Sequence, residues 1–533
     1  MSEFDVIIIG GGATGAGTLR DCAMRGLKCL LIEKRDISNG ATGRNHGLLH
    51  SGARYAVTDQ ESARECIGEN MILRKIARHC VDETDGFFLS MPDDDLGFQS
   101  KFVDACHQAG IRADVLDPAE ARRLEPAMNP DAIGAVRVPD GSVDPFRLTA
   151  ANIKDGIDHG GKVLTYHEVE DFIRRQDRIE GVRVRDMHTG EIKEFRAKIV
   201  VNAGGIWGSL IAKQAGVTVN MFPAKGALLI YGHRANKIVL NRCRKPSNAD
   251  ILVPGDTICV IGTTSTKVPF DQVDDMRVLP EEVKILRQGA EELSPMLKYT
   301  RIMRAYAGVR PLVASDADPS GRSISRGIVL FDHEKRDGLK GFLTITGGKL
   351  MTYRLMAKEV TDKICEDLHI DKQCQTADIP LPGSRTAPQE VAKKIYSMSA
   401  PQKQSIVYRH GDMAPAMLKK NTLDRTMVCE CESVSYSEVE YAIDNLHVNN
   451  LVDLRRRTRV GMGSCQGEFC ACRAMGILAA KKHLDPRAER LHLADFLNER
   501  WKGVCPIASG NQLRESQFSA WVYENVCGLT DDK

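Results

Sequence analysis

The sequence predicts an α/β protein in which a large nucleotide-binding part is followed by a small, mainly helical metal-binding domain. Three observations lead to this prediction: a length of 533 residues, a strand–glycine–helix pattern at the N-terminus, and five cysteines within residues 429–472. A chain of this length exceeds what one hydrophobic core holds, so several domains are expected. Its hydrophobic content of 42% and charged content of 27% are those of ordinary globular proteins.

The bulk composition excludes some classes of partner. A formal charge of +2 gives no reason to expect nucleic acid as a partner. No stretch approaches the roughly 18 apolar residues of a membrane-spanning helix. The first residues lack the basic region of a signal peptide, so we expect a cytosolic setting with reduced thiols.

The N-terminus carries a dinucleotide-binding pattern. Residues 5–9, Asp-Val-Ile-Ile-Ile, form a continuous apolar run that predicts a buried parallel strand. The glycine-rich sequence G-x-G-x-x-G follows at residues 10–15, and a helix is expected over 16–25. A second strand at 28–32 ends at Glu33. Strand, turn, helix, strand and acid in this order predict a nucleotide site.

Each residue type in this pattern has a physical role. Gly10 permits the tight turn, Gly12 lets the backbone approach a pyrophosphate, and Gly15 allows close packing of helix on strand. The helix N-terminus offers unpaired amides to the phosphates. Glu33, about twenty residues after the turn, is placed to accept ribose hydroxyls.

The segment after Glu33 distinguishes the kind of nucleotide. Residues 36–55 are polar and glycine-rich, unlike the next strand–helix unit of a nicotinamide domain, and no second G-x-G-x-x-G follows. This segment resembles the one that runs along FAD in the D-amino-acid-oxidase-like flavoproteins, and residues 200–207 resemble a turn that lies against the nucleotide there. A single bound FAD is therefore implied.

The resemblance also implies which positions bind FAD. They lie in the glycine-rich turn, at the end of the second strand, in the segment after it and at a few later turns. They are Gly10, Gly12, Ala13, Thr14, Gly15, Glu33, Lys34, Thr42, Gly43, Gly47, Leu48, Val169, Ala203, Gly204, Trp207, Gly348, Lys349 and Leu350.

A narrower resemblance covers nearly the whole chain. Residues 48–55, 306–312 and 346–354 resemble motifs of the FAD-dependent glycerol-3-phosphate dehydrogenases, and 223–226 and 261–264 fit as well. With the C-terminal cysteines added, the chain resembles the A subunits of the anaerobic enzymes of bacteria. The implied fold is an FAD-binding, Rossmann-like, D-amino-acid-oxidase-like domain with an α+β substrate domain, followed by a helical iron–sulfur domain.

The family's substrate-site positions fall on residues suited to a phosphate. Arginine binds phosphate through two parallel hydrogen bonds, and Arg54 and Arg310 match those positions. Tyr55 adds a hydroxyl donor. Lys349 either stabilises the negative charge of the reduced flavin or contacts the substrate. His50 is a general base or a structural histidine, so the base is left open.

The clustered cysteines predict a metal centre. Cys429 and Cys431 form one close pair, and Cys465, Cys470 and Cys472 follow in a second group. This layout resembles the bacterioferritin-associated-ferredoxin-type [2Fe–2S] domain, which needs four thiolates. Structural zinc also takes four, but its pairs usually follow C-x2–4-C spacing, so zinc is the weaker interpretation.

We predict Cys429, Cys431, Cys465 and Cys470 as the ligands, with Cys472 as the alternative to Cys470. The basic run 455–459 just before this group is expected to offset thiolate charge or to meet a partner.

Breaks in periodicity and proline-rich stretches predict the domain limits. We expect an oxidoreductase domain over 1–370, a connecting segment over 371–424, a [2Fe–2S] domain over 425–480 and a helical region over 481–533.

The resemblance implies a function in electron transfer. The chain is expected to oxidise sn-glycerol 3-phosphate to dihydroxyacetone phosphate and to pass electrons through the cluster. Its expected partners are a membrane-anchoring iron–sulfur subunit together with a second dehydrogenase subunit. It would reduce quinone indirectly and lie peripherally on the cytoplasmic face of the bacterial inner membrane. An FMN elsewhere in such an assembly is left open. Two alternatives are a D-amino-acid or opine dehydrogenase and an electron-transfer protein without catalysis of its own.

Overall fold

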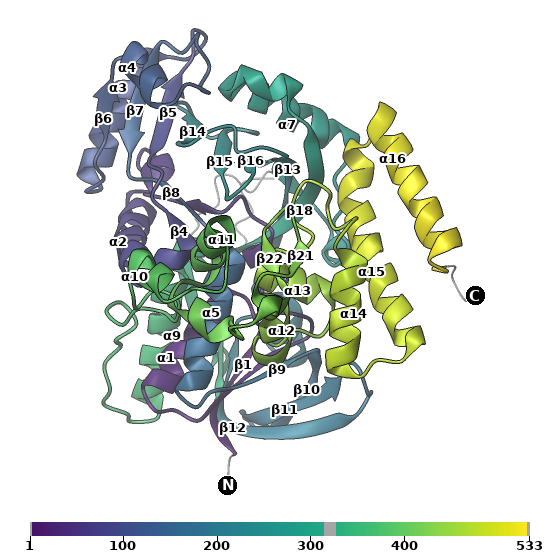
Figure 1. Ribbon diagram of the computed structural model, residues 1–533. Coiled ribbons are helices and arrows are strands. Elements are labelled where there is room, and N and C mark those ends of the chain that lie inside the picture. Colours follow the sequence, from purple (N-terminus) through teal and green to yellow (C-terminus); the bar gives the residue numbers. More distant parts are fainter. Residues whose placement is uncertain (1–2, 314–326, 530–533) are drawn as a thin grey trace.

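Two large β-sheets and a C-terminal layer of helices make up the protein (Figure 1). The computed structural model describes residues 3–313 and 327–529. Helices from the last third of the chain, coloured green and yellow, lie along one side of the sheets. The fold therefore places the cysteine segment against the nucleotide-binding part.

The first sheet has eight strands and carries the nucleotide fingerprint. At its centre β1 (Phe4–Ile9) lies parallel to β2 (Cys29–Glu33) on one side and to β12 (Ile192–Asn202) on the other. Its inner residues are fully buried, as expected of an apolar run covered on both faces. The other strands are β9 (Lys162–Thr165), β10 (His167–Arg175), β11 (Arg178–Asp186), β19 (Ile328–Asp332) and β20 (Phe342–Gly347).

Three helices cover one face of this sheet. α1 (Ala13–Met24) begins directly after Gly12, three residues earlier than the expected start, and packs against α5 (Pro145–Asp158) and α9 (Tyr353–Asp367). The earlier start brings the helix amides to the glycine turn itself. A buried ion pair of 2.8 Å between Arg20 and Asp155 joins α1 to α5.

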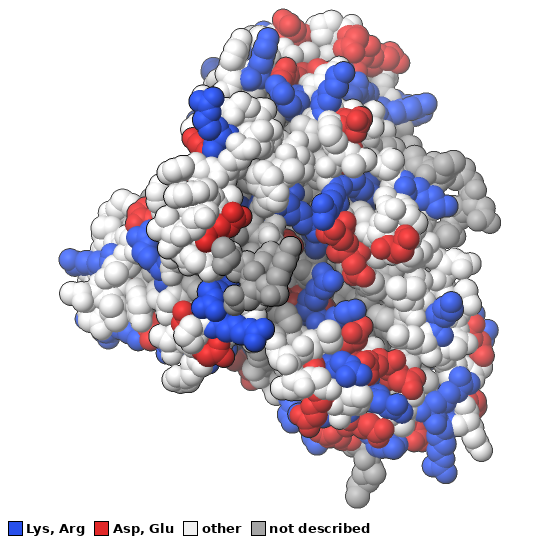
Figure 2. Space-filling view, turned by 90° about the vertical axis from the view of Figure 1, so that its right-hand side faces the viewer, with Lys and Arg blue, Asp and Glu red and all other residues white. Residues whose placement is uncertain are grey.

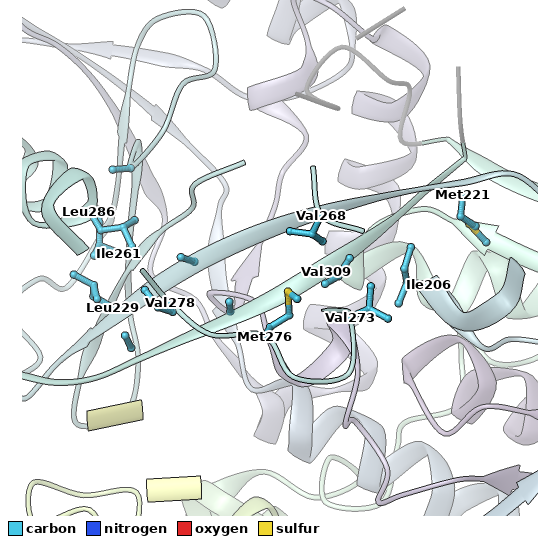
Figure 3. Close-up of a cluster of buried hydrophobic side chains, with 14 of the residues drawn as sticks. Ile206, Met221, Leu229, Ile261, Val268, Val273, Met276, Val278, Leu286 and Val309 are labelled. Carbon is cyan, nitrogen blue, oxygen red and sulfur yellow. The ribbon is translucent and has the colours of Figure 1, made fainter. Parts of the chain in front are cut away.

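The second sheet has nine strands and lies beside the first. Its long neighbours β13 (Met221–Tyr231) and β18 (Ile302–Val313) pair antiparallel, and α7 (Pro280–Leu293) packs on them. Figure 3 shows the core between these elements, where Leu229, Ile261 and Leu286 meet. The other strands are β5 (Gly86–Ser90), β6 (Asp114–Leu116), β7 (Gly134–Val138), β14 (Val239–Arg242), β15 (Ile251–Pro254), β16 (Cys259–Gly262) and β17 (Thr266–Lys267).

Shorter elements connect the two sheets. A three-stranded sheet of β3 (Leu48–Leu49), β8 (Gly141–Val143) and β4 (Val81–Asp82) lies between them. The remaining helices of this part are α2 (Gln60–Ile76), α3 (Leu96–Gln108), α4 (Pro118–Leu124), α6 (Gly208–Gln214) and α8 (His333–Asp337).

The C-terminal third is mainly helical. The helices expected near 437–446, around 452 and up to 482 are present as α12 (Tyr436–Asn445), α13 (Leu451–Thr458) and α14 (Ala471–Lys482). Two short strands and four further helices complete this part: β21 (Met427–Cys429), β22 (Val434–Ser435), α10 (Pro388–Lys393), α11 (Ala400–His410), α15 (Pro486–Val504) and α16 (Gly510–Trp521). The exact domain limits stay predictions.

Three further features of the described structure concern its surface charge, its helices and its cysteines. Acidic and basic side chains are interspersed over the face drawn in Figure 2. Within residues 3–313 and 327–529, no helix combines the length and the apolar character that crossing a membrane requires. All sixteen cysteines are free.

Candidate active site and metal centre

A cavity of about 520 Å³ opens at the carboxyl ends of β1, β2, β12 and β20. Ligands of parallel α/β sheets bind at this edge. Ile9 and Gly10 follow one strand, Glu33 ends the next, and Ala203 follows the third. The cavity therefore stands where the N-terminal pattern predicts a nucleotide.

The walls of this cavity fit a dinucleotide. Gly10 has φ +113°, and a Cβ there would lie 2.6 Å from the Ala203 carbonyl oxygen. A Cβ on Gly12 would lie 3.1 Å from the Thr42 hydroxyl oxygen, so side chains at either glycine would narrow the space. Gly12 has no side chain to cap α1. The Thr42 hydroxyl accepts a hydrogen bond from the Ala13 amide at 3.0 Å, and the amides that follow in the first turn suit phosphate oxygens.

Glu33 lines the cavity where the ribose is predicted to lie. Its carboxylate accepts hydrogen bonds from the backbone amides of Gly11 at 2.6 Å and Arg35 at 2.8 Å. Burial raises its pKa above the ordinary value. These two amides fix the carboxylate at the cavity wall, in the place predicted for contact with ribose hydroxyls.

Most of the predicted FAD positions line this cavity, and three do not. A Cβ on Gly15 would lie 1.9 Å from the Gly10 carbonyl oxygen, so this glycine serves helix–strand packing. Gly43 and Gly47 line a second, smaller cavity instead. The segment that contains them separates the two cavities, and these glycines face its far side.

The five predicted catalytic residues also line this cavity, which we call the flavin cavity after the cofactor predicted for it. The Lys349 amine lies 4.7 Å from the centre of the Tyr55 ring, and the His50 ring centre lies 5.5 Å from that of Tyr55. Arg54 and Arg310 reach the same cavity from η2 (Ala53–Tyr55) and β18. Cationic and proton-carrying groups from three separate segments therefore meet at one place.

Each of the two arginines is held by a neighbour. Arg54 donates to the buried carboxylate of Asp250 at 3.0 Å, and its Nη1 is buried without a hydrogen-bond partner among the described residues. Arg310 donates to the Thr264 carbonyl oxygen at 3.0 Å and to the Thr263 hydroxyl. A Cβ on Gly226 would lie 2.7 Å from the Arg310 guanidinium, so a side chain there would push the guanidinium aside. Both guanidinium groups are positioned before any ligand binds.

Two supporting residues, Asp250 and Thr263, were not predicted from the sequence. Asp250 immediately precedes the buried strand β15 and is itself fully buried, which is unusual for an acid. Thr263 belongs to the segment 261–264, which the resemblance included without a role. The sequence did contain one signal for Asp250, because an acidic residue directly before an apolar run indicates a buried carboxylate.

The four predicted ligand cysteines meet in two pairs. The Cys431 and Cys465 sulfur atoms are 3.8 Å apart. Cys429 and Cys470 share a hydrogen bond, which lowers the pKa of Cys429 to about 7 and raises that of Cys470. A [2Fe–2S] cluster takes two thiolates on each iron. Within the described chain, no three His, Cys, Asp or Glu side chains surround a single point as one zinc ion requires.

Cys472 faces away from these pairs. Burial raises the pKa of its thiol, which shares a hydrogen bond with the Tyr523 hydroxyl. Cys470 precedes the first turn of α14, where its side chain reaches Cys429. The geometry therefore favours Cys470 as the fourth ligand.

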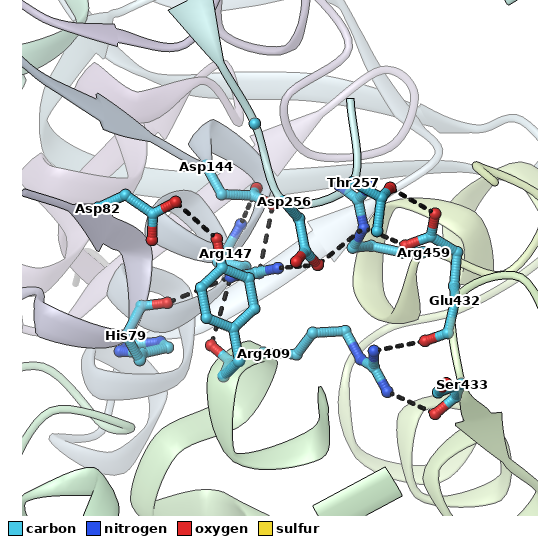
Figure 4. A network of polar contacts seen from close by, with 12 residues as sticks. His79, Asp82, Asp144, Arg147, Asp256, Thr257, Arg409, Glu432, Ser433 and Arg459 are labelled. Carbon is cyan, nitrogen blue, oxygen red and sulfur yellow. Dashed lines mark hydrogen bonds and ion pairs between the residues drawn. The ribbon is translucent and has the colours of Figure 1, made fainter. Parts of the chain in front are cut away.

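The basic run 455–459 joins the cysteine domain to the nucleotide-binding part. Arg456 binds the Asp36 carboxylate at 2.9 Å, and Arg457 binds the same carboxylate. Arg459 binds Glu432 at 2.7 Å, close to the contacts of Arg409 (Figure 4). Three arginines of this run therefore bind carboxylates of the chain itself, and the expected roles in offsetting thiolate charge or meeting a partner stay predictions.

Comparison with known proteins settles the family. A family model described as "FAD dependent oxidoreductase" matches residues 5–354, and one described as "BFD-like [2Fe-2S] binding domain" matches residues 427–480. The A subunit of the anaerobic glycerol-3-phosphate dehydrogenase from Haemophilus influenzae is 60% identical over 529 residues, which are 99% of this chain and 94% of that protein. The chain belongs to this family.

A second relative and a solved structure support this assignment. The corresponding protein of Escherichia coli is also 60% identical, over 99% of this chain and 98% of its own length. The structure of glycerol-3-phosphate dehydrogenase from Bacillus halodurans complexed with FAD has a TM-score of 0.73 at 21% identity and covers 96% of this chain and 97% of its own. The predicted fold class is confirmed, and so are the cofactors of this family member, FAD and a [2Fe–2S] cluster.

Proposed function

We propose that the chain oxidises sn-glycerol 3-phosphate to dihydroxyacetone phosphate. The observation that carries this proposal is the convergence of Arg54, Arg310 and Lys349 on the flavin cavity. Three cationic side chains suit a phosphate dianion, for which guanidinium groups are the preferred donors. The printed names of the 60% identical relatives support the same substrate.

The proposed roles follow from the positions of the side chains. Arg54 and Arg310 bind the phosphate, since both are fixed by Asp250 and Thr263 before substrate enters. Lys349 and Tyr55, in contact through the Tyr55 ring, orient the rest of the substrate.

Two cofactors determine what happens to the electrons, because bound FAD accepts a hydride and a [2Fe–2S] cluster carries single electrons.

His50 lies beside Tyr55 and is the candidate to take the proton of the 2-hydroxyl. Its imidazole lines the cavity, as this role requires.

The destination of the electrons is also a proposal. We infer that they leave through the thiol site toward a membrane-anchoring iron–sulfur subunit, which acts with a second dehydrogenase subunit, and then reach quinone. The word "subunit" in the relatives' names supports an assembly. Such an assembly would hold the chain peripherally at the cytoplasmic face of the inner membrane.

Substrate-dependent dye reduction tests the catalytic proposal. The FAD-loaded chain is given glycerol 3-phosphate, D-amino acids or opines, and reduction of an artificial acceptor is followed. We expect turnover with glycerol 3-phosphate at a kcat/KM at least tenfold above any amino acid. Faster turnover with an amino acid would contradict the substrate. A flavin that none of them bleaches would instead favour an electron-transfer protein without catalysis.

A further inference from the structure

A second cavity, of about 260 Å³, lies between the flavin-binding part and the cysteine domain. Its walls come from the segment 38–47, from β18, from α13 and from the end of α15. Arg44, Asn45 and His46 line both this cavity and the flavin cavity, so the segment forms a wall between them. The flavin cavity, whose walls fit a dinucleotide, has twice this volume, about 520 Å³.

Three arginines line this cavity without an acidic partner in the described structure. Arg44 follows η1 (Ala41–Gly43), Arg304 lies on β18, and Arg455 lies on α13. In the described part of the chain, no carboxylate lies within 4 Å of any of these guanidinium groups. Arg455 is only 8% exposed, and its side chain donates one long hydrogen bond, of 3.4 Å, to Gln466.

The other arginines at this interface are paired, which makes the contrast informative. Arg147 lies 3.2 Å from Asp144 and also approaches Asp256. Arg459 binds Glu432 at 2.7 Å. Figure 4 shows this neighbouring network. Of the three cavity arginines, Arg304 donates a hydrogen bond of 3.3 Å to the Glu499 carbonyl oxygen, but none has an acidic partner in the described structure. Among the arginines described at this interface, the lack of an acidic partner is therefore confined to the three that line the cavity.

The charge around the cavity is unbalanced. Among the described lining residues, seven are arginine or lysine and four are aspartate or glutamate. Burial lowers the pKa of Arg44, Arg304 and Arg455, and the positive charge of Arg456 lowers each further. The charge of Glu499 reaches all three, but its side chain is exposed and makes no ion pair within 4 Å in the described structure. Arg455 is buried and Arg44 and Arg304 are half-buried, and cations withdrawn from water in this way are costly unless an anion accompanies them.

The rest of the lining is suited to an uncharged group. Phe146, Met276, Val278 and Ile230 line the cavity, and Tyr306 lies among them with its hydroxyl bound to the Asn45 carbonyl oxygen at 2.7 Å. A ligand with an anionic end and an apolar or aromatic body would therefore fill both regions.

We propose that this cavity binds the phosphate group of a small molecule, held by Arg44, Arg304 and Arg455. Guanidinium groups bind phosphate oxygens through paired hydrogen bonds, and three of them leave no oxygen without a donor. The source is free phosphate or a phosphate monoester of about mononucleotide size. The proposal is independent of which substrate the flavin cavity takes.

A ligand here would join the two parts of the chain. Arg455 belongs to the cysteine domain, whereas Arg44 and Arg304 belong to the flavin-binding part. An anion bound by all three bridges the interface and stabilises the docked arrangement. The thermal midpoint of the full chain is therefore expected to rise with ligand concentration.

Equilibrium dialysis of the FAD-saturated full chain tests the proposal. Inorganic phosphate, AMP and FMN are the three probes, and excess FAD keeps the flavin cavity filled. The variants are Arg455→Gln and Arg304→Gln, which remove one guanidinium group from each side of the interface. Arg183→Gln, an exposed arginine on β11, is the control for loss of one positive charge. Thermal unfolding of each variant without probe shows whether it folds.

The expected result is one equivalent of at least one probe that Arg310→Gln also binds, which separates it from phosphate held at the proposed substrate site. Arg455→Gln and Arg304→Gln should raise the Kd of this equivalent at least tenfold, and Arg183→Gln should leave it unchanged. Comparing the three probes identifies the source: equal binding of all three indicates free phosphate, and tighter binding of AMP or FMN indicates a monoester. Absence of binding by every probe, or equal Kd in the folded cavity variants and the control, would overturn the proposal.

Discussion

The flavin cavity and the thiol site are built in opposite ways. The flavin cavity draws its lining from strand ends and loops spread over residues 9–356, and Arg54 and Arg310 are each supported by a further side chain. The thiol site uses two short segments, 429–431 and 465–470, whose sulfur atoms meet each other in pairs. A distributed site should lose function by degrees, whereas a site made of four ligands should fail when one is removed.

The largest effect is expected at the thiol site. Cys470→Ser should abolish the cluster, because a hydroxyl replaces one of four required thiolates. Visible absorption and bound iron measure this loss. Cys472→Ser is the matched control two residues away, and it should keep both signals. Loss in the control with retention in Cys470→Ser would exchange the two assignments.

In the flavin cavity, Arg310→Gln should lower kcat/KM for glycerol 3-phosphate by roughly 10²–10³-fold. Two charge-assisted hydrogen bonds of about 1.5–3 kcal/mol each would be lost, and part of that loss is recovered by the amide. Steady-state kinetics measures the change, and FAD content should stay constant. Arg301→Gln, an exposed position on the surface, is the control. A fall of less than threefold in Arg310→Gln would remove this residue from the phosphate site.

The cysteine domain also rests on a buried charge network. Glu438 accepts hydrogen bonds from Arg409 and His410, each at 2.8 Å. Glu438→Gln should lower the free energy of unfolding by about 3–5 kcal/mol, because Arg409 is left buried without a counter-charge. Asp444→Asn, which breaks a surface pair on the same helix, should cost about 1 kcal/mol or less. Urea unfolding of the wild type and both variants, followed by limited proteolysis, measures these differences in the free energy of unfolding.

The same network predicts a pH dependence. Burial opposes ionisation of Glu438, but Arg409 and His410 outweigh it and lower its pKa from 4.5 to about 2. A carboxyl group with a lowered pKa contributes its full stability above the unfolded value and loses it as pH falls. The stability difference between the wild type and Glu438→Gln should therefore be constant above about pH 4.5 and shrink toward pH 2. A difference that grows with acidity would contradict this assignment.

The smallest effect is expected from a supporting residue of the flavin cavity. Asp250→Asn keeps the shape of the side chain but weakens its hold on Arg54, so KM for glycerol 3-phosphate should rise roughly tenfold, about 1.4 kcal/mol. The value of kcat should change less than threefold. Asp177→Asn, an exposed surface pair, serves as the control. An equal fall in kcat and kcat/KM would place Asp250 in the chemical step instead.

The local parts of this molecule were predictable, and the contacts between distant parts were not. The strand, glycine turn, helix and Glu33 follow from patterns within thirty residues, and the thiol spacing led to the right kind of centre. The partner of Arg456 and Arg457 is Asp36, some 420 residues away, so charge pattern alone could not identify it. Gly43 and Gly47 were placed against FAD because the resemblance identifies a segment but not which side of it faces the ligand.

The central claim is that electrons pass from the substrate through the flavin-binding part to the cluster within this one chain. Anaerobic addition of glycerol 3-phosphate to the FAD- and cluster-loaded protein tests it directly, with flavin absorption and the electron paramagnetic resonance of the cluster followed together. We expect flavin absorption to fall and the signal of a reduced [2Fe–2S] cluster to appear, and we expect Cys470→Ser to keep only the first change. A bleached flavin beside a cluster that stays oxidised would contradict it.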